Sequence, residues 1–188
     1  MLDLGDFASA ERILEELEKK HPKDALVRLT LVELAVRRCE PAAAETHLFE
    51  AQKLGAEPRT LRIARAQIAQ VRGLMASRAG QNEPARGHFE AAIELEPAWA
   101  GPWINLGVLA EGASDLDRAR SCYLHALEIE PDHPVALYNA ARLYSRAGDP
   151  KAASALVGRL LETVPEYPGG RELADSMNSR ADSMKKSS

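Results

Sequence analysis

Apolar residues follow a helical spacing along most of this chain, and the pattern itself repeats every 34 residues. The clearest phrase begins at Ala85, Ala119 and Ala153. Each alanine is followed by a bulky apolar residue four positions later, then by another apolar residue and a proline: Phe89, Ala92 and Pro97; Tyr123, Ala126 and Pro131; Val157, Leu160 and Pro165. A period of this length is typical of repeat arrays, in which each unit packs only on its neighbours. The pattern favours a scaffold that presents a surface to another molecule, and it does not identify that molecule.

One unit near the middle of the chain predicts two antiparallel helices. Trp103, Leu106 and Ala110 recur at helical spacing, so they share one face of a first helix. A turn then interrupts the pattern before Asp115, a residue type that caps the N-terminus of a second helix well. Pro131 ends this second helix, because the residue before a proline is disfavoured in the helical conformation. The sequence therefore predicts an all-α fold.

The repeated phrase divides residues 1–167 into an array of such helix pairs. The predicted repeats cover about 25–58, 66–99, 100–133 and 134–167. A half repeat at 5–22 precedes them, in which Gly5 and Asp6 stand at the turn position and only the second helix is expected. A seven-residue insertion near 59–65 breaks the period, and we expect it to lengthen the following first helix by about two turns.

The last segment, residues 168–188, predicts a C-terminal capping helix followed by a disordered tail. Pro168 and two glycines break the array, and a weak apolar stripe follows at Leu173, Met177, Ala181 and Met184. Repeat arrays need such terminal caps for solubility. The tail, from Lys185 to Ser188, is predicted to be disordered.

Composition and charge narrow the class of function. Hydrophobic residues make up 45% of the chain and charged residues 28%, and the net charge is −4. Nucleic-acid-binding domains are usually strongly basic, so we do not expect a nucleic-acid partner. No apolar run approaches the length of a membrane span, and the N-terminus lacks the basic region of a secretory signal. Cys39 and Cys122 have no partner motif, which favours free thiols in a cytoplasmic protein.

Motifs that would carry catalysis or hold a cofactor are missing from the sequence. The five histidines are scattered, the cysteines do not form a zinc motif, and there is no phosphate-binding glycine loop or nucleophile elbow. We therefore expect no enzyme activity, no metal and no cofactor. Arg59, Arg62 and Arg65 form a basic edge in the insertion. Because the net charge is negative, we favour a solvated face or a partner-binding rim there over a phosphate contact.

A family resemblance is carried by the central unit, with Trp103, Leu106 and Gly107 in the first helix and Ala119, Tyr123, Ala126 and Pro131 in the second. This run resembles the signature of the tetratricopeptide repeat, and the resemblance covers residues 5–167. It implies a right-handed α-solenoid of antiparallel helix pairs. The concave groove of such a superhelix is lined mainly by the first helix of each repeat.

Two parts of the chain depart from the family pattern. The unit that begins at Ala25 has Arg28, Leu31 and Val32 where the family favours an aromatic residue, leucine and glycine. Arg72 occupies a position that the family usually fills with a buried leucine. Either the insertion shifts the register of that helix, or the Arg72 side chain reaches solvent along its stem.

The resemblance also implies which residues face a bound partner. The candidate ligand-binding residues at the family's groove positions are Gln70, Leu74, Ile104, Asn105, Val108, Tyr138, Asn139, Arg142 and Arg146. In similar proteins an asparagine at the position of Asn105 and Asn139 bonds the backbone of an extended peptide; alternatively, these amides only satisfy nearby polar groups. Arg142 and Arg146 lie one turn apart and would hold an acidic residue or a chain-terminal carboxylate. The alternative is a basic face paired with a neighbouring glutamate.

The carboxylate clamp of chaperone-binding family members is not reproduced here. Clamp-forming proteins have a basic residue and an asparagine at the positions of Gln70 and Leu74. They need a further basic residue at the position of Val135. We therefore do not expect a chaperone tail as the partner.

Three hypotheses of function follow. The first is a non-enzymatic protein-protein interaction scaffold that binds an extended peptide in the groove. The second is a substrate-selecting or partner-selecting piece of a larger modifying enzyme, because the chain begins in the middle of a repeat. The third is a self-associating scaffold, because the unpaired N-terminal helix carries apolar residues at Phe7, Ala10, Leu14 and Leu17.

Overall fold

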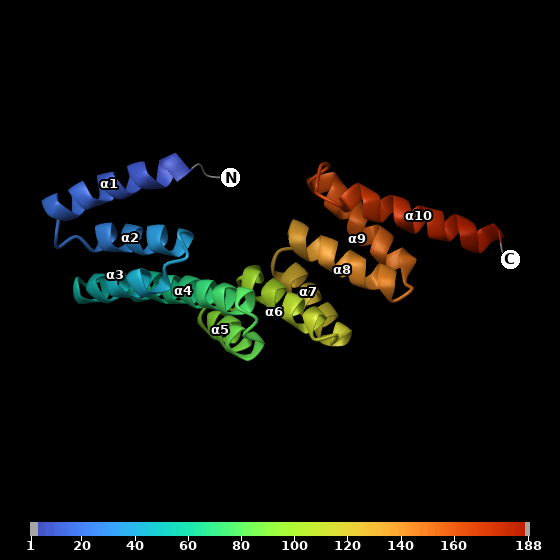
Figure 1. Ribbon diagram of the computed structural model, residues 1–188, viewed down its shortest axis with the longest axis horizontal. Coiled ribbons are helices and arrows are strands. Elements are labelled where there is room, and N and C mark those ends of the chain that lie inside the picture. Colours follow the sequence, from blue (N-terminus) through green and yellow to red (C-terminus); the bar gives the residue numbers. More distant parts are fainter. Residues whose placement is uncertain (1–3, 187–188) are drawn as a thin grey trace. The chain divides into compact units, whose positions relative to one another are not determined.

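The computed structural model describes the backbone of residues 4–186 and the side chains of Ser9, of residues 12–177 and of Ser179. Within these residues the chain forms ten helices and no strand, and it separates into two compact units, one ending at Pro97 and one beginning at Ala98 (Figure 1). The helices of the first unit are α1 (Leu4–Lys20), α2 (Ala25–Arg37), α3 (Pro41–Lys53), α4 (Pro58–Arg78) and α5 (Asn82–Leu95). Those of the second are α6 (Ala100–Gly112), α7 (Leu116–Ile129), α8 (Pro134–Arg146), α9 (Pro150–Thr163) and α10 (Gly170–Lys186).

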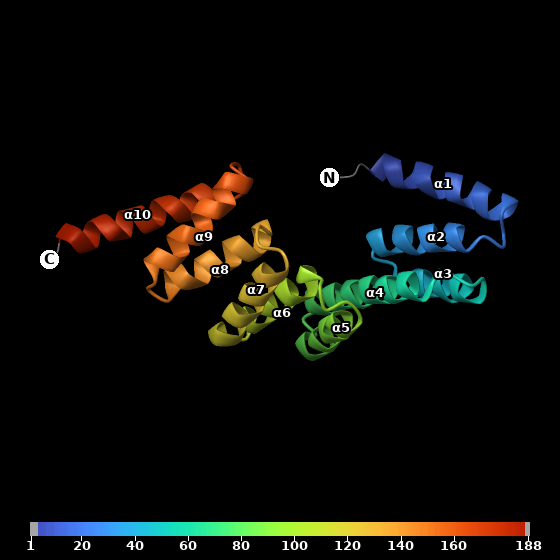
Figure 2. The same cartoon turned by 180° about the vertical axis from the view of Figure 1, so that it is seen from behind.

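Each predicted repeat forms a pair of packed helices, and the pairs are α2–α3, α4–α5, α6–α7 and α8–α9 (Figure 2). Turns between the helices use the signals expected from the sequence. The Asp115 side chain accepts a hydrogen bond from the backbone N–H of Arg118 at 3.1 Å, and the Asp149 side chain accepts one from Ala152 at 3.0 Å. Gly80 and Gly148 adopt φ values of +73° and +80°, a region that glycine enters without steric cost. The predicted antiparallel all-α repeats are confirmed.

Helix α4 has 21 residues, whereas the first helices of the other three pairs have 13. The insertion thus lengthens this helix by about two turns, as expected. The repeat register survives the insertion, because Gly73 in α4 faces Phe89 as Gly107 in α6 faces Tyr123. In both pairs a Cβ atom added to the glycine would lie 2.5 Å from a ring carbon. The extra turns therefore belong to the N-terminal half of α4.

Small and large side chains are matched within each helix pair. Glycine faces an aromatic ring in two pairs, whereas the equivalent positions hold Val32 with Leu48 in the α2–α3 pair and Ala141 with Val157 in the α8–α9 pair. A larger residue on the first helix thus accompanies a smaller one on the second. This match explains why Val32, a departure from the family pattern, is almost completely buried without a clash.

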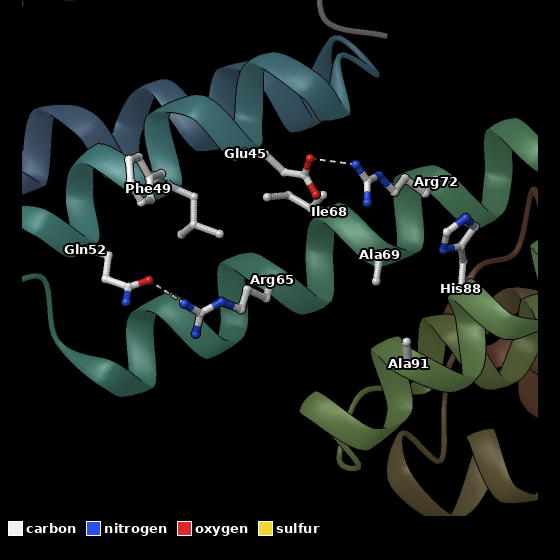
Figure 3. Close-up of a pocket in the computed structure, with 10 residues that line it drawn as sticks. Glu45, Phe49, Gln52, Arg65, Ile68, Ala69, Arg72, His88 and Ala91 are labelled. Atoms are coloured by element: carbon white, nitrogen blue, oxygen red, sulfur yellow. Dashed lines mark hydrogen bonds and ion pairs between the residues drawn. The ribbon is translucent and has the colours of Figure 1, made fainter.

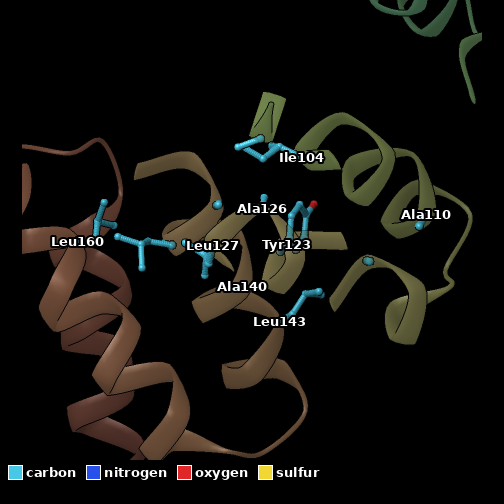
Figure 4. Close-up of a cluster of buried hydrophobic side chains, with 12 residues drawn as sticks. Ile104, Ala110, Tyr123, Ala126, Leu127, Ala140, Leu143 and Leu160 are labelled. Carbon is cyan, nitrogen blue, oxygen red and sulfur yellow. The ribbon is translucent and has the colours of Figure 1, made fainter. Parts of the chain in front are cut away.

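The core of the second unit lies between α6, α7, α8 and α9. Its buried side chains include Ile104, Tyr123, Leu127, Leu143 and Leu160 (Figure 4). Helix α10 packs on α9, where Met177 joins the buried cluster formed by Ala141, Ala153 and Val157. Helix α10 thereby covers the end of the array. Ala181 and Met184, the other two positions of the predicted stripe, lie outside the described side chains.

Two expectations about the chain ends are wrong. Gly5 and Asp6 are part of helix α1 and do not form a turn. Lys185 and Lys186 belong to α10, so the helix continues into the predicted disordered tail. Ser187 and Ser188 lie outside the described residues.

Helix α1 packs on α2 through Leu14, which is buried with Val27, Leu31 and Leu34. Arg28 of α2 also forms an ion pair with Glu18 of α1. Ile13 and Leu17 are exposed on α1, whereas the side chains of Phe7 and Ala10 lie outside the described residues.

Candidate functional site

The two predicted groove asparagines lie on the first helices of consecutive repeats in the second unit. Asn105 on α6 is half-buried, and Asn139 on α8 is only 8% exposed. Neither side chain has a hydrogen-bond partner within the described part of the chain. A primary amide has two donors and an acceptor with two lone pairs, so both side chains keep their full capacity to bind a peptide group.

The apolar candidates beside Asn105 differ in exposure. Ile104 is only 5% exposed and belongs to the core of the second unit, whereas Val108 is 48% exposed. One helical turn separates these two residues, so they lie on the same face of α6. The core of the second unit covers Ile104, whereas Val108 is left at the surface.

Glu111 of α6 forms ion pairs with both candidate arginines of α8, Arg142 and Arg146. Arg142 Nη2 donates to Glu111 Oε2 at 2.7 Å, and Arg146 Nη1 donates to Glu111 Oε1 at 3.0 Å. The Glu111 side chain is only 12% exposed, which strengthens both contacts relative to a fully solvated pair. The sequence left two alternatives for Arg142 and Arg146: holding a partner's carboxylate, or pairing with a neighbouring glutamate. The pairing with a glutamate is present in the structure. Two guanidinium groups share one carboxylate, so this group of three side chains carries a net positive charge.

The buried Tyr123 belongs to the same network. Its hydroxyl donates to Glu111 Oε2 at 3.3 Å. Burial raises the pKa of the Tyr123 phenol far above its usual value, and the negative charge and hydrogen bond of Glu111 raise this pKa further. Tyr123 therefore remains a neutral donor, and the network ties α6, α7 and α8 together.

Tyr138 packs against the turn that leads into α10. Its ring lies 5.3 Å from the Tyr167 ring between centroids, at an interplanar angle of 43°. Its hydroxyl lies so close to Gly169 that a Cβ atom there would approach it to 2.8 Å, and Gly169 has a φ of +76°. Burial raises the pKa of the Tyr167 hydroxyl, with a smaller contribution from Tyr138. Tyr138 thus holds the end of the array together while remaining partly exposed.

The remaining candidates, Gln70 and Leu74, lie on α4 in the first unit and are half-buried. The Gln70 side-chain oxygen is buried and has no hydrogen-bond partner within the described residues. The structure therefore brings seven of the nine candidates together on α6 and α8, with Gln70 and Leu74 one turn apart on α4.

A pocket of about 390 Å³ in the first unit was not anticipated from the sequence. Its lining comes from α3 (Glu45, Leu48, Phe49, Gln52), α4 (Arg65, Ile68, Ala69, Arg72) and α5 (His88, Ala91), as Figure 3 shows. Arg72 Nη2 donates to Glu45 Oε2 at 2.6 Å, and Arg65 Nη2 donates to Gln52 Oε1 at 2.7 Å. The insertion does not shift the repeat register of α4. The alternative prediction for Arg72, that its side chain reaches solvent, is therefore confirmed.

No metal site is formed within the part of the chain that the structure describes, since no three histidine, cysteine or acidic side chains converge there. Cys39 and Cys122 are free thiols, as predicted. Burial raises the pKa of the Cys122 thiol, which makes it a poor nucleophile.

Burial lowers the pKa of the His47 imidazole. The Glu18 carboxylate partly opposes this shift, and the positive charge of Arg28 adds to it.

None of the described helices combines the length and the apolar character needed to cross a membrane. The expected basic edge of the insertion is divided among different partners. Arg62 forms an ion pair with Glu96 at 3.0 Å, whereas Arg65 turns to Gln52 at the pocket.

Comparisons with known proteins agree with this architecture. The model of a family described as "Tetratricopeptide repeat" matches residues 1–68 and 109–173. No curated protein matches the sequence. Among solved structures, the chain is similar to the Arabidopsis OM64 TPR domain, with a TM-score of 0.59, 16% identity, and coverage of 63% of this chain and 98% of that one.

Two further structures are similar over more of the chain. The MamA protein has a TM-score of 0.52 and 21% identity, with coverage of 84% of this chain and 82% of that one. YrrB, described as a TPR protein with an unusual peptide-binding site, has a TM-score of 0.51 and 19% identity, with coverage of 94% and 87%. At these identities the likeness concerns the fold.

Proposed function

Because the chain belongs to the tetratricopeptide repeat family, we propose that it is a non-enzymatic interaction scaffold that holds an extended segment of a protein partner along helices α6 and α8. Stacked repeats form an extended surface that runs along several helices. An extended segment of a partner can contact such a surface over several residues. The partner is therefore a peptide or a protein, and the proposal involves no cofactor.

The observation that carries this proposal is the pair of amides at Asn105 and Asn139, which have no hydrogen-bond partner within the described residues. A bound peptide group would replace solvent at both amides, and each such hydrogen bond contributes about 0.5–1.5 kcal/mol net. The amides recognise backbone, not side chains, so they would hold an extended segment largely independently of its sequence. Val108 adds an exposed apolar contact beside them.

Sequence preference would come from the arginines. Arg142 and Arg146 share Glu111, and Arg142 Nε is buried without a hydrogen-bond partner in the described residues. An acidic side chain or a C-terminal carboxylate of the partner would accept hydrogen bonds from the guanidinium N–H groups that do not bind Glu111. Partners with an acidic residue at this end of the segment should be preferred.

Paired affinity capture from an extract of the source cells tests the proposal. One bait is the wild-type chain, and the other carries Asn105→Ala, Asn139→Ala and Arg146→Glu. Arg146 is chosen because it is the more exposed of the two arginines, so Arg142 keeps its contact with Glu111. Lys151→Glu on α9 is the control for a change of charge at an exposed position.

A partner that the wild type and the Lys151→Glu control capture, and that the triple variant loses while its helical content is unchanged, supports the proposal. Direct titration with a peptide from that partner must then give the same ranking of the three proteins. Equal binding by all three would refute the assignment to α6 and α8.

Self-association through α1 is a second candidate function. Ile13 is 55% exposed and Leu17 is 36% exposed on a helix that covers α2 with only part of its surface. Light scattering over a wide range of protein concentration tests it, with Ile13→Glu as the variant. A mass that stays monomeric at all concentrations would refute it.

A further inference from the structure

The pocket between α3, α4 and α5 has a physical origin that the next repeat reveals. In the second unit Trp103 of α6 packs on His125 of α7, with 4.2 Å between ring centroids and an interplanar angle of 59°. The residues 34 positions earlier are Ala69 and Ala91, and both line the pocket. Their methyl groups point toward one another (Figure 3). The space that two rings fill in one repeat is therefore left open in the other.

A third residue that lines the pocket is also smaller than its counterparts in the next two repeats. Leu48 on α3 occupies the position that holds Phe89 in α5 and Tyr123 in α7, so the wall of the pocket has an aliphatic side chain where the other two helices have rings. Leu48 and Ile68 are both buried and form part of the first unit's core. The base of the pocket is thus apolar and is built from well-packed residues.

The rim of the pocket is polar and carries a net positive charge. Arg72 is paired with Glu45, but Arg65 donates to Gln52, whose amide is neutral. The charge of Arg65 therefore has no acidic counterpart among the residues that line the pocket. His88 lies on the same rim. Phe49, which is 57% exposed, extends the apolar surface outward from the pocket, and Lys53 Nζ lies 4.1 Å from the centre of its ring.

We propose that this pocket binds a partner peptide that inserts an aromatic side chain, tryptophan above all, between Ala69 and Ala91 and places an acidic residue against Arg65. The ring preference follows from the Trp103–His125 pair, which shows what the equivalent space accommodates. The acidic preference follows from the charge of the rim, since a carboxylate would replace the neutral amide of Gln52 as the acceptor of Arg65. None of the groove candidates lines this pocket, so the inference does not rest on the proposed function.

Titration with a defined peptide, acetyl-Asp-Glu-Trp-Asp-Glu-amide, tests this inference on the full chain. Two control peptides replace the tryptophan by alanine or the four acidic residues by their amides. Binding is followed by fluorescence anisotropy of labelled peptides and by NMR of alanine methyl groups. We expect the Ala69 and Ala91 methyl signals to shift strongly, because an indole ring would lie directly beside both.

Two variants separate the roles of the ring and the charge. Ala69→Trp combined with Ala91→His fills the pocket with the pair that the next repeat uses, so it should keep the fold and abolish binding. Arg65→Glu reverses the charge of an exposed residue and should weaken binding about tenfold or more, because an attractive contact becomes repulsive. Asn105→Ala with Asn139→Ala, which disables the site proposed on α6 and α8, should leave this binding unchanged.

Any one of several results would overturn the inference. The first is the absence of methyl shifts at Ala69 and Ala91 at millimolar peptide. The second is equal binding of the alanine control peptide, and the third is binding that survives in a correctly folded pocket-filling variant. Should that variant fail to fold, Arg65→Glu still decides, because a binding constant unchanged by charge reversal contradicts the acidic preference. Loss of binding in the Asn105→Ala and Asn139→Ala variant would assign the peptide to the other site and refute this one.

Discussion

Replacing Gly107 by alanine should destabilise the second unit, although alanine is the better helix former. The new Cβ atom would lie 2.5, 2.8 and 2.9 Å from three ring carbons of Tyr123. Ordinary van der Waals contact between carbons needs about 3.5–4.0 Å. The ring is completely buried, so it cannot swing aside into solvent. Either the ring or helix α6 must move.

The magnitude follows from two opposing terms. Overpacking a filled core costs about 1–3 kcal/mol, and the short contacts with a fully buried ring place this site near the upper limit. The change from glycine to alanine within a helix contributes about 1 kcal/mol in the stabilising direction. We therefore expect a net loss of about 2 kcal/mol. For a chain of this size that loss lowers the melting temperature by about 4–8 °C.

Gly158 provides the matched control. It lies within α9, is exposed, and would have nothing within 4 Å of an added Cβ atom. Gly158→Ala should therefore stabilise the chain by about 1 kcal/mol through helix propensity alone. The two glycine-to-alanine changes should differ in sign.

Thermal unfolding followed by tryptophan fluorescence is a suitable assay, because both tryptophans, Trp99 and Trp103, lie in the second unit. A compensating variant tests the cause. Gly107→Val with Tyr123→Leu copies the Val32 and Leu48 pair of the first unit, and it should be more stable than Gly107→Val alone. If Gly107→Ala proved as stable as Gly158→Ala, the argument from steric contact would be refuted.

Three further predictions concern pH and backbone conformation. Because the pKa of Tyr123 is raised, its phenol should stay protonated in the folded chain well above pH 10, and Tyr123→Phe should remove the latest step of a spectrophotometric alkaline titration. The pKa of His47 is lowered in the folded state, so the unfolded chain binds the proton more readily: the contribution of His47 to stability is complete above its unfolded pKa, near 6.5, and is lost as the pH falls below that value. Melting temperatures measured between pH 8 and 5 should therefore decrease less steeply in His47→Gln, and parallel curves would contradict this account. Gly148→Ala places a side chain at a φ of +80° and should cost about 1 kcal/mol or more in urea unfolding, while an unchanged midpoint would show that the turn relaxes.

The repeat architecture was predictable from the sequence because its signals are local. A capping aspartate such as Asp115 or Asp149 acts within one helical turn, and a glycine such as Gly148 marks the end of a helix by its own backbone freedom. The misread turn at Gly5 shows the limit of this logic. Glycine permits a turn but does not require one, and here the helix continues through it.

The candidate site was predictable only in part, because its electrostatics depend on contacts between distant residues. Arg142 and Glu111 are separated by 31 positions, and the sequence around each residue does not predict their ion pair. The burial of Asn139 likewise depends on its neighbours in space. The pocket was missed for a different reason: its signal is the absence of side chains at Ala69 and Ala91, which becomes visible only when these positions are compared with Trp103 and His125.

The match between small and large side chains within each helix pair also bears on how such a chain evolves. The partner of Gly73 is Phe89 and that of Gly107 is Tyr123, so each steric match is contained within a single repeat. A duplication or deletion of one whole repeat would carry both members together and leave no mismatch behind. Substitution of one member alone would require a compensating change only 16 positions away. The array can therefore change its length by recombination more readily than it can change any one of these positions by point mutation.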